Sequence, residues 1–303
     1  MKILITGSTG LVGSSLNRLF KKSSYEVFPA RREDANLFSY EETKKLLSQV
    51  QPDIVINAAA KVGGIYANNT QRTNFILENL KINMNLLEAS VDFPNLKLVN
   101  LGSSCIYPLN ASNPISEDSL MEGKLEPTNS PYAMAKLTAI EIGRAIKSEY
   151  GINVINLMPT NLYGPNDNFS EMGSHVIPGL IYRMHNSKLN KDDLFKVWGS
   201  GTPKREFLHV DDLAKAIDFI LKNDIKDDLL NIGSGDEVSI LELVNLIKDE
   251  IKFEGDIVFD QTKPDGNPRK LLDSAKIKSY GWRDEIKLKE GIHQVYEWFK
   301  KNT

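Results

Sequence analysis

The residues best suited to chemistry lie in one stretch, from Leu101 to Lys136. Ser103 and Cys105 follow an apolar run and stand two positions apart, so an extended backbone would direct both side chains to one face. Tyr132 and Lys136 stand four positions apart in a segment with a helical pattern, which places phenol and ammonium on one side of a helix. A hydroxyl, a thiol, a phenol and an ammonium at one strand end predict an active site.

A glycine-rich turn follows the first apolar run, Lys2 to Thr6. Gly7 to Gly13 reads GSTGLVG and precedes a predicted helix and a second predicted strand. Strand, glycine-rich turn, helix and strand are the opening of a dinucleotide-binding fold, in which backbone N–H groups at the helix start approach a pyrophosphate. On this motif alone, a purely structural turn stays open.

Two arginines end the second predicted strand, where a cofactor without a 2′-phosphate would usually meet Asp or Glu on its ribose. Arg31 and Arg32 stand there instead. Because a guanidinium suits bidentate contacts to phosphate, the pair favours NADP over NAD. The alternative is that one of the two is only solvated surface.

The elements that must position these residues alternate strand and helix up to about residue 165, and the regularity breaks from about Asn166. Such alternation predicts an α/β fold, a Rossmann-type doubly wound parallel sheet, with a smaller, interleaved C-terminal α/β lobe for the substrate. We expect residues 1–165 to form the NADP-binding domain, with returning elements near 206–235, and residues 166–303 to form mainly the substrate lobe. Asp211 is expected to cap the helix that follows it.

Composition narrows the class of protein. The chain of 303 residues has 37 Lys and Arg against 40 Asp and Glu, a formal net charge of -3, which argues against a nucleic-acid or anionic-membrane partner. Cys105 is its one cysteine, so no intramolecular disulfide can form. No apolar run approaches the ~20 residues of a membrane span, and the first residues show no signal-peptide core. We expect a cytoplasmic protein that binds no metal.

Several longer segments carry a resemblance to a known family. The GxxGxxG spacing and the Tyr132-to-Lys136 YxxxK pattern are general features of short-chain dehydrogenase/reductases. More specific are NAAAKVGG (57–64), LGSSCIYP (101–108), LEPTNSPYAMAK (125–136), PTNLYGPNDNF (159–169), SHVIPGL (174–180), WGSGTPKREFLHVDD (198–212) and KPDGNPRKLLD (263–273). In this order the segments resemble the extended short-chain dehydrogenase/reductases, and within them the GDP-4-keto-6-deoxymannose epimerase/reductases, or GDP-L-fucose synthases.

The resemblance implies an NADPH-dependent bifunctional enzyme that epimerises carbons 3 and 5 of a GDP-4-keto-6-deoxyhexose and then reduces carbon 4. Protons beside a ketone are acidic, so one carbonyl can serve both epimerisations, each with a base on one face and an acid on the other. Three points stay open. The substrate could be a related GDP-4-keto sugar of the colitose or deoxy-heptose type, the protein could be a non-catalytic NADP-binding sensor, and the family's homodimer is expected by resemblance alone.

Five residues take catalytic roles by the same resemblance. Tyr132 would protonate the new alkoxide, Lys136 would bind the nicotinamide ribose and favour the charged form of the phenol, and Ser103 would donate to the ketone oxygen. Cys105 and His175 match the acid/base pair of the epimerisations.

The binding residues that the resemblance implies form two sets. The cofactor set is Gly7, Ser8, Thr9, Gly10, Leu11, Val12, Gly13, Arg31, Arg32, Leu101, Gly102, Ser103, Ser104, Lys136, Pro159, Thr160, Asn161, Leu162 and His175. The GDP-sugar set is Arg183, Trp198, Arg205, Asp265, Lys270 and Asn161. Thr9 departs from the family, many members of which carry a basic residue there, so the preference for NADP is predicted to rest on Arg31 and Arg32 and to be weaker.

Overall fold

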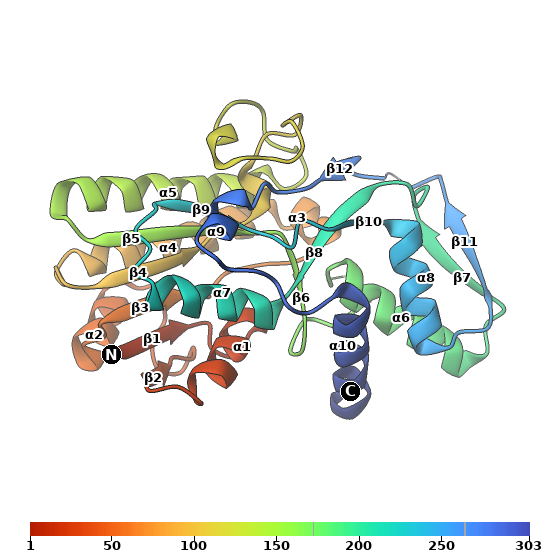
Figure 1. Ribbon diagram of the computed structural model, residues 1–303, viewed down its shortest axis with the longest axis horizontal. Helices are drawn as coiled ribbons and strands as arrows, with labels where there is room; N and C mark the ends of the chain where they lie inside the picture. The colour runs from red at the N-terminus through yellow and green to blue at the C-terminus, as the bar shows by residue number, and fades with distance from the viewer. Residues whose placement is uncertain (172, 264) are drawn as a thin grey trace.

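Six parallel strands form the central sheet of the computed structural model, which describes residues 1–171, 173–263 and 265–303 (Figure 1). In spatial order they are β2 (Glu26–Pro29), β1 (Lys2–Thr6), β3 (Ile54–Asn57), β4 (Lys97–Leu101), β5 (Asn153–Pro159) and β9 (Leu229–Ile232). The order runs outward in both directions from β1 and β3. The expected doubly wound parallel sheet is therefore confirmed, and its switch point lies between the carboxyl ends of β1 and β3.

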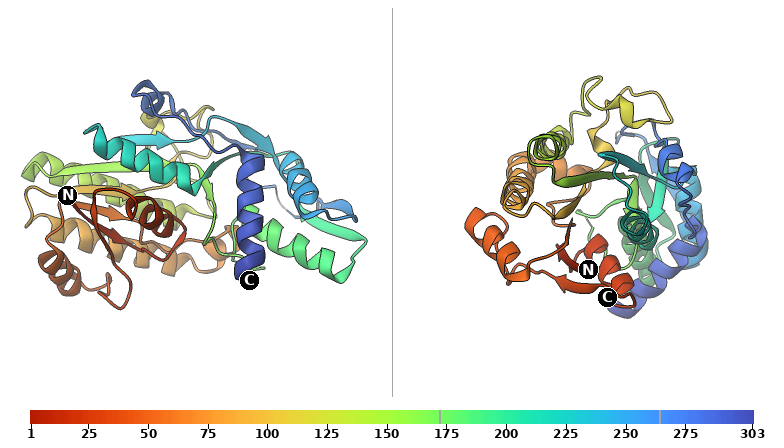
Figure 2. Two further views of the ribbon diagram at one scale, coloured as in Figure 1. Left: turned by 60° about the horizontal axis from the view of Figure 1, so that its bottom comes forward. Right: turned by 60° about the vertical axis from the view of Figure 1, so that its left-hand side comes forward.

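Helices cover both faces of this sheet (Figure 2). One face carries α1 (Leu11–Phe20) and α7 (Val210–Lys222), and the other carries α2 (Tyr40–Val50), α4 (Arg72–Ser90) and α5 (Ser130–Tyr150).

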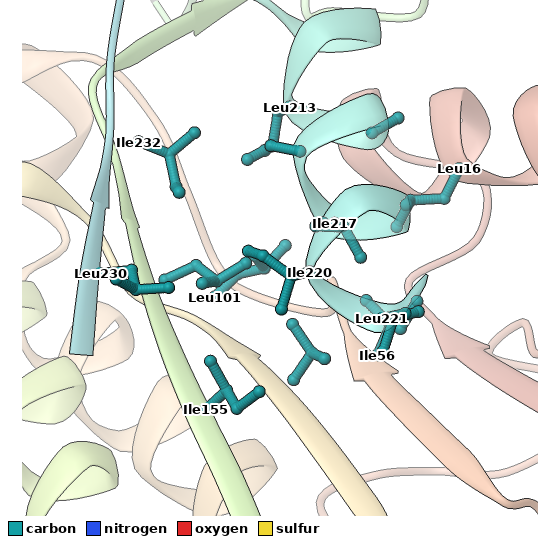
Figure 3. Close-up of a cluster of buried hydrophobic side chains, with 14 of the residues drawn as sticks. Leu16, Ile56, Leu101, Ile155, Leu213, Ile217, Ile220, Leu221, Leu230 and Ile232 are labelled. Carbon is teal, nitrogen blue, oxygen red and sulfur yellow. The ribbon is translucent and has the colours of Figure 1, made fainter. Parts of the chain in front are cut away.

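The two layers follow from the alternation of side chains along each strand. In β1, Ile3 and Ile5 face the cluster with α1 and α7, whereas Leu4 faces the cluster on the opposite side. Figure 3 shows the first cluster, where Ile217 and Ile220 of α7 lie over the sheet.

A second lobe contains the remaining strands and its own core. β8 (Lys204–His209) pairs with β10 (Glu237–Ser239), β12 (Arg269–Lys270) and β6 (Asn161–Tyr163), and β7 (Leu194–Trp198) pairs with β11 (Asp256–Asp260). Helices α6 (Val176–Asn190), α8 (Ile240–Ile251) and α10 (Leu288–Asn302) pack around that core. The short helices are α3 (Ile65–Thr70), η1 (Ser104–Ile106), η2 (Glu117–Ser119) and α9 (Ala275–Ser279).

The chain crosses between the lobes more than once. It enters the second sheet with β6, before residue 165, and returns to the first through α7 and β9. The division at 165 stays a prediction. Among the described residues, every helix is too short or too polar to span a bilayer.

The start of α7 differs from the expectation for Asp211. The His209 ring accepts a hydrogen bond from the Asp211 N–H at 3.2 Å, so His209 is the capping residue. The Asp211 carboxylate instead accepts from Ser15 and from Arg18, at 2.7 Å from the guanidinium, and joins α7 to α1. The expected cap is therefore wrong, because Asp211 lies within the first turn of α7 and the residue that precedes the helix caps it.

Buried asparagines join the strands beneath the candidate site. Asn57 donates to Asn100 at 3.3 Å and to Asn83 of α4 at 3.0 Å, and Asn100 donates to Asn156 of β5 at 3.0 Å. Thr6 donates to Asn57 at 3.0 Å. A buried amide is stable only when it is paired, so this network fixes how β1, β3, β4 and β5 lie side by side.

Candidate functional site

The glycine-rich turn has the geometry of a phosphate cradle. Gly7 has a φ of 64°, and the Gly10 N–H donates to the Gly7 carbonyl at 3.1 Å. A Cβ atom at Gly13 would overlap the Gly7 carbonyl, so only glycine allows the helix to start so close to the turn. No side chain caps α1 at Gly10, which leaves the first N–H groups of Leu11 and Val12 for an anion. The turn fits a dinucleotide pyrophosphate.

The end of β2 lies beside this turn, because the Ser8 N–H donates to the Ala30 carbonyl at 3.4 Å. Arg31 and Arg32 follow, both exposed. The Arg31 guanidinium lies 3.3 Å from Glu33, whereas the guanidinium of Arg32 has no ion-pair partner among the described residues. Of the two, Arg32 is the better placed to meet a 2′-phosphate.

Lys136 lies inside the protein at the end of β4. Its side chain is 2% exposed and its Nζ donates to the Leu101 carbonyl at 2.7 Å. Burial lowers the pKa of Lys136 from 10.5 to about 8. A Cβ atom at Gly102 would overlap the Met158 side chain, and Ser104 is buried. The strand end therefore presents backbone rather than large side chains to a cofactor.

Tyr132 shares this site with Ser103. Burial, followed by the charge of Cys105, raises the pKa of Tyr132 far above its ordinary value, and a hydrogen bond with Ser103 opposes the rise. Lys136 is not among the causes; its Nζ lies 5.7 Å from the ring centroid of Tyr132. Burial favours the neutral phenol, the form that can donate a proton, and the expected effect of Lys136 on the phenol stays a prediction.

Cys105 lies between the tyrosine and the second lobe. Its side chain is half-buried, its N–H donates to Ser103 Oγ at 3.3 Å, and its Sγ accepts from Asn129 Nδ2 at 3.5 Å. Burial lowers the pKa of Arg205 on β8, and the charges of Asp265 and then of Cys105 oppose this shift. The thiol thus lies within electrostatic range of Tyr132 and of a cation.

His175 stands immediately before α6 and is 42% exposed at its side chain. Its Nδ1 lies 3.8 Å from an Asp167 carboxylate oxygen, and the other oxygen of that carboxylate is buried with no hydrogen-bond partner among the described residues. No hydrogen bond within those residues joins His175 to Cys105. The structure gives each member of the expected acid/base pair a polar neighbour of its own.

Two glycines bring the loop of His175 toward the tyrosine. The Gly64 N–H donates to the Gly173 carbonyl at 3.3 Å, and a Cβ atom at Gly64 would overlap the Ser174 carbonyl. A Cβ atom at Gly63 would lie 3.3 Å from Phe75, whose ring meets Tyr132 edge-on at 6.3 Å between centroids. The second lobe therefore approaches the site through the NAAAKVGG segment.

The residues expected to bind the GDP-sugar lie in the second lobe, and several are held by neighbours. Arg183 donates to the Lys196 carbonyl at 3.2 Å and stacks over Phe195 at 5.2 Å, and burial lowers its pKa. Asp265 accepts from the Ser200 N–H at 2.6 Å.

Trp198 and Lys270 are the aromatic residue and a further cation of the expected GDP-sugar set. Trp198 is 54% exposed, with Lys263 Nζ 5.9 Å from its ring. Lys270 lies on β12, beside Arg205 in the strand register. An exposed ring next to a lysine suits a base followed by phosphates.

Asn161 was expected to bind cofactor and substrate, and its side chain also makes a hydrogen bond within the fold. Its Nδ2 donates to the Glu206 carbonyl at 2.8 Å, as does Thr160 Oγ1 at 3.2 Å. The buried Glu206 carboxylate accepts from the N–H groups of Gly235 and Leu272 at 2.8 and 3.1 Å. Pro159 and Thr160 are buried at the end of β5, and Leu162 packs against the core.

Sequence reasoning missed three residues of the site: Asn129, Asp167 and Glu206. Each lies inside a segment used for the resemblance, but the sequence carries no signal for its contact. In the described part of the chain, ligand atoms of Glu250, His293 and Glu297 lie within 4.8 Å of one another. That group lies on α8 and α10, and none of its three residues was expected in the site. The side chains of two of them are exposed by a third or more.

Comparison with known proteins places the chain in a family. The model of the NAD dependent epimerase/dehydratase family matches residues 3–233. A GDP-L-fucose synthase of Sinorhizobium fredii (strain NBRC 101917 / NGR234) is 46% identical over 100% of this chain and 96% of its own. A GDP-L-fucose synthetase structure from Naegleria fowleri bound to NADP has a TM-score of 0.90 at 30% identity, over 99% of this chain and 94% of its own. A GDP-6-OMe-4-keto-L-xylo-heptose reductase structure from C. jejuni has a TM-score of 0.91 at 32% identity, over 100% and 98%. The chain belongs to the NAD dependent epimerase/dehydratase family.

Proposed function

We propose that the protein is an NADPH-dependent enzyme that converts GDP-4-keto-6-deoxy-D-mannose to GDP-L-fucose, by epimerisation at carbons 3 and 5 and reduction at carbon 4. The full-length similarity to a GDP-L-fucose synthase carries the proposal. The site supports it, since Lys136 binds the end of β4 and the pKa of Tyr132 responds to both Ser103 and Cys105.

The epimerisations would use Cys105 and His175. The thiolate of Cys105 would take the proton beside the ketone, and His175 would return a proton to the opposite face of the carbon. The hydrogen bond from Ser103 would stabilise the enolate oxygen. A plain reductase needs no thiol at this place, which is why Cys105 favours the bifunctional reading.

The reduction would use the neutral phenol of Tyr132. When bound, NADPH supplies the hydride that reduces carbon 4. Gly7 to Gly13 would hold its pyrophosphate and Lys136 its nicotinamide ribose. Tyr132 would then give its proton to the new alkoxide, and burial keeps that proton on the phenol until it is needed.

The test is turnover of GDP-4-keto-6-deoxymannose with NADPH in deuterated water, with the product analysed by NMR. We expect GDP-L-fucose with deuterium at carbons 3 and 5. The Cys105→Ala variant should lose both labels. A variant that still exchanges both positions would contradict the role of Cys105, and wild-type protein that binds NADPH without turnover would contradict the enzyme assignment.

A second candidate is the same chemistry on a related GDP-4-keto sugar, such as a deoxy-heptose or a colitose-type dideoxy-hexose. The similarity to the GDP-6-OMe-4-keto-L-xylo-heptose reductase structure favours keeping it. Comparison of kcat/KM for several GDP-4-keto sugars decides between the substrates. A higher value for a heptose than for the deoxymannose would replace the first candidate.

We also propose a homodimer in the cytoplasm. Helices α4 and α5 pack together and leave Leu77, Met84 and Met134 exposed at 48%, 44% and 46% of their surface. Apolar side chains on neighbouring helices suit an interface with a second copy. The lone Cys105 fits a reducing compartment. Light scattering should show a dimer for the wild type and a monomer for Met84→Glu; a wild-type monomer would contradict the proposal.

A further inference from the structure

Asn129 occupies a helix-capping position without capping the helix. It immediately precedes α5, and Asn at such a position usually accepts a hydrogen bond from the first turn. Its side chain makes no cap hydrogen bond here, and its Nδ2 instead donates to Cys105 Sγ at 3.5 Å. The Asn129 amide thus binds the thiol instead of capping α5.

The backbone around Asn129 is held from two sides. The Glu126 carboxylate accepts from the N–H groups of Thr128 and Asn129 at 3.0 and 3.1 Å. From α4, the Arg72 guanidinium donates to the Pro127 carbonyl at 2.8 Å. Because an acid and a base clamp this turn, the distance from the amide to the sulfur is set by the fold rather than by a mobile loop.

The oxygen of the Asn129 amide provides a second observation. Asn129 Oδ1 is buried and has no hydrogen-bond partner among the described residues. Among the described residues, the one hydrogen bond that the Asn129 side chain makes is therefore the bond to the sulfur.

We propose that Asn129 is a positioning residue for Cys105, whose amide N–H orients the sulfur and stabilises its thiolate for proton removal from the sugar. A thiolate is a strong acceptor, and a nearby N–H donor or cation increases the thiolate fraction. Two other groups lie within electrostatic range of the sulfur, the neutral acid Tyr132 and the cation Arg205. This inference rests on the proposed role of Cys105 and adds a residue that acts through it.

The experiment uses the full-length protein and the fact that Cys105 is its one cysteine, so alkylation reports on this thiol alone. Iodoacetamide labelling at a fixed neutral pH is followed by mass spectrometry for the wild type and for Asn129→Ala, Asn129→Asp and Asn129→Ser. We expect labelling to slow several-fold in the Ala and Ser variants. In the Asp variant, a carboxylate replaces the donor, and we expect a loss of tenfold or more.

The variants separate this role from a structural one. If Asn129 served only as a cap, Asp and Ser, which are good caps, would behave as the wild type. If it only filled space, truncation to Ala would expose the sulfur and speed its labelling. Either result would overturn the proposal. Circular dichroism and the midpoint of thermal unfolding check that each variant is folded.

Isotope exchange completes the test. In the presence of GDP-4-keto-6-deoxymannose, Asn129→Asp should reduce deuterium incorporation at carbons 3 and 5 at least tenfold. Exchange at the wild-type rate in Asn129→Asp would overturn the inference. If instead Cys105→Ala itself exchanges normally, the proposed function of the thiol fails, and the labelling rates still decide whether Asn129 controls it.

Discussion

Replacing the buried Lys136 by methionine is expected to abolish turnover. It should also change the free energy of unfolding, relative to the wild type, by an amount that depends on pH. Burial lowers the pKa of Lys136 from 10.5 to about 8. The difference is about 2.5 pH units, which at ~1.36 kcal/mol per unit makes the folded state about 3 kcal/mol less stable than if the lysine titrated normally. Methionine has similar length and no charge, so Lys136→Met removes this cost.

The substitution also removes the hydrogen bond to the Leu101 carbonyl. A buried carbonyl that loses its donor costs roughly 1–3 kcal/mol, so at pH 7 the variant should be as stable as the wild type or slightly more stable. The folded wild type binds fewer protons than the unfolded chain between pH 8 and 10.5, hence its stability rises with pH in this window. The advantage of the variant should therefore fall by about 2.5 kcal/mol between pH 7 and pH 10.

Urea unfolding of both proteins at pH 7 and pH 10 measures this difference, and an NADPH oxidation assay should show loss of turnover in the variant. Lys147→Met is the matched control, because Lys147 lies on the same helix and donates to a carbonyl, that of Lys226, at 2.9 Å on the exposed surface. This control separates the loss of a lysine hydrogen bond at the surface from the loss of the buried charge. A difference between wild type and Lys136→Met that stays constant from pH 7 to pH 10 would refute the reasoning.

Four further substitutions test the fold and the cofactor site. Gly13→Ala places a Cβ atom against the Gly7 carbonyl, so it should abolish NADPH binding in a fluorescence titration; unchanged affinity would contradict the assigned cradle. Ile217→Ala opens a cavity under α7 and should cost roughly 2–5 kcal/mol with an unchanged m-value in urea, whereas a loss below ~1 kcal/mol would mean the core there is loosely packed. Arg32→Ala should weaken NADPH about tenfold with NADH unaffected, and more than Arg31→Ala, whose guanidinium is already paired; equal effects would refute the difference between the arginines.

Local patterns were sufficient to predict the parallel sheet and the cofactor turn. The continuous apolar run of β1 and the glycines of 7–13 act through neighbouring residues, and their physics is contained in the chain segment itself. The resemblance covered the whole chain in order, and the family was confirmed over 100% of its length. The types and spacing of Ser103, Tyr132 and Lys136 therefore determined where to look for the site.

Only the tertiary structure decided how the side chains of the site are paired and charged. Burial, which no spacing reveals, keeps Tyr132 neutral and lowers the pKa of Lys136. The Asp211 carboxylate does not cap α7 as expected, and it accepts a hydrogen bond from Ser15, 196 positions away. Asn129 reaches Cys105 because Arg72 and Glu126 clamp a turn that folds back over the strand end. Such contacts depend on where distant segments meet, and desolvation depends on everything that covers a group, so they become visible only once the chain is folded.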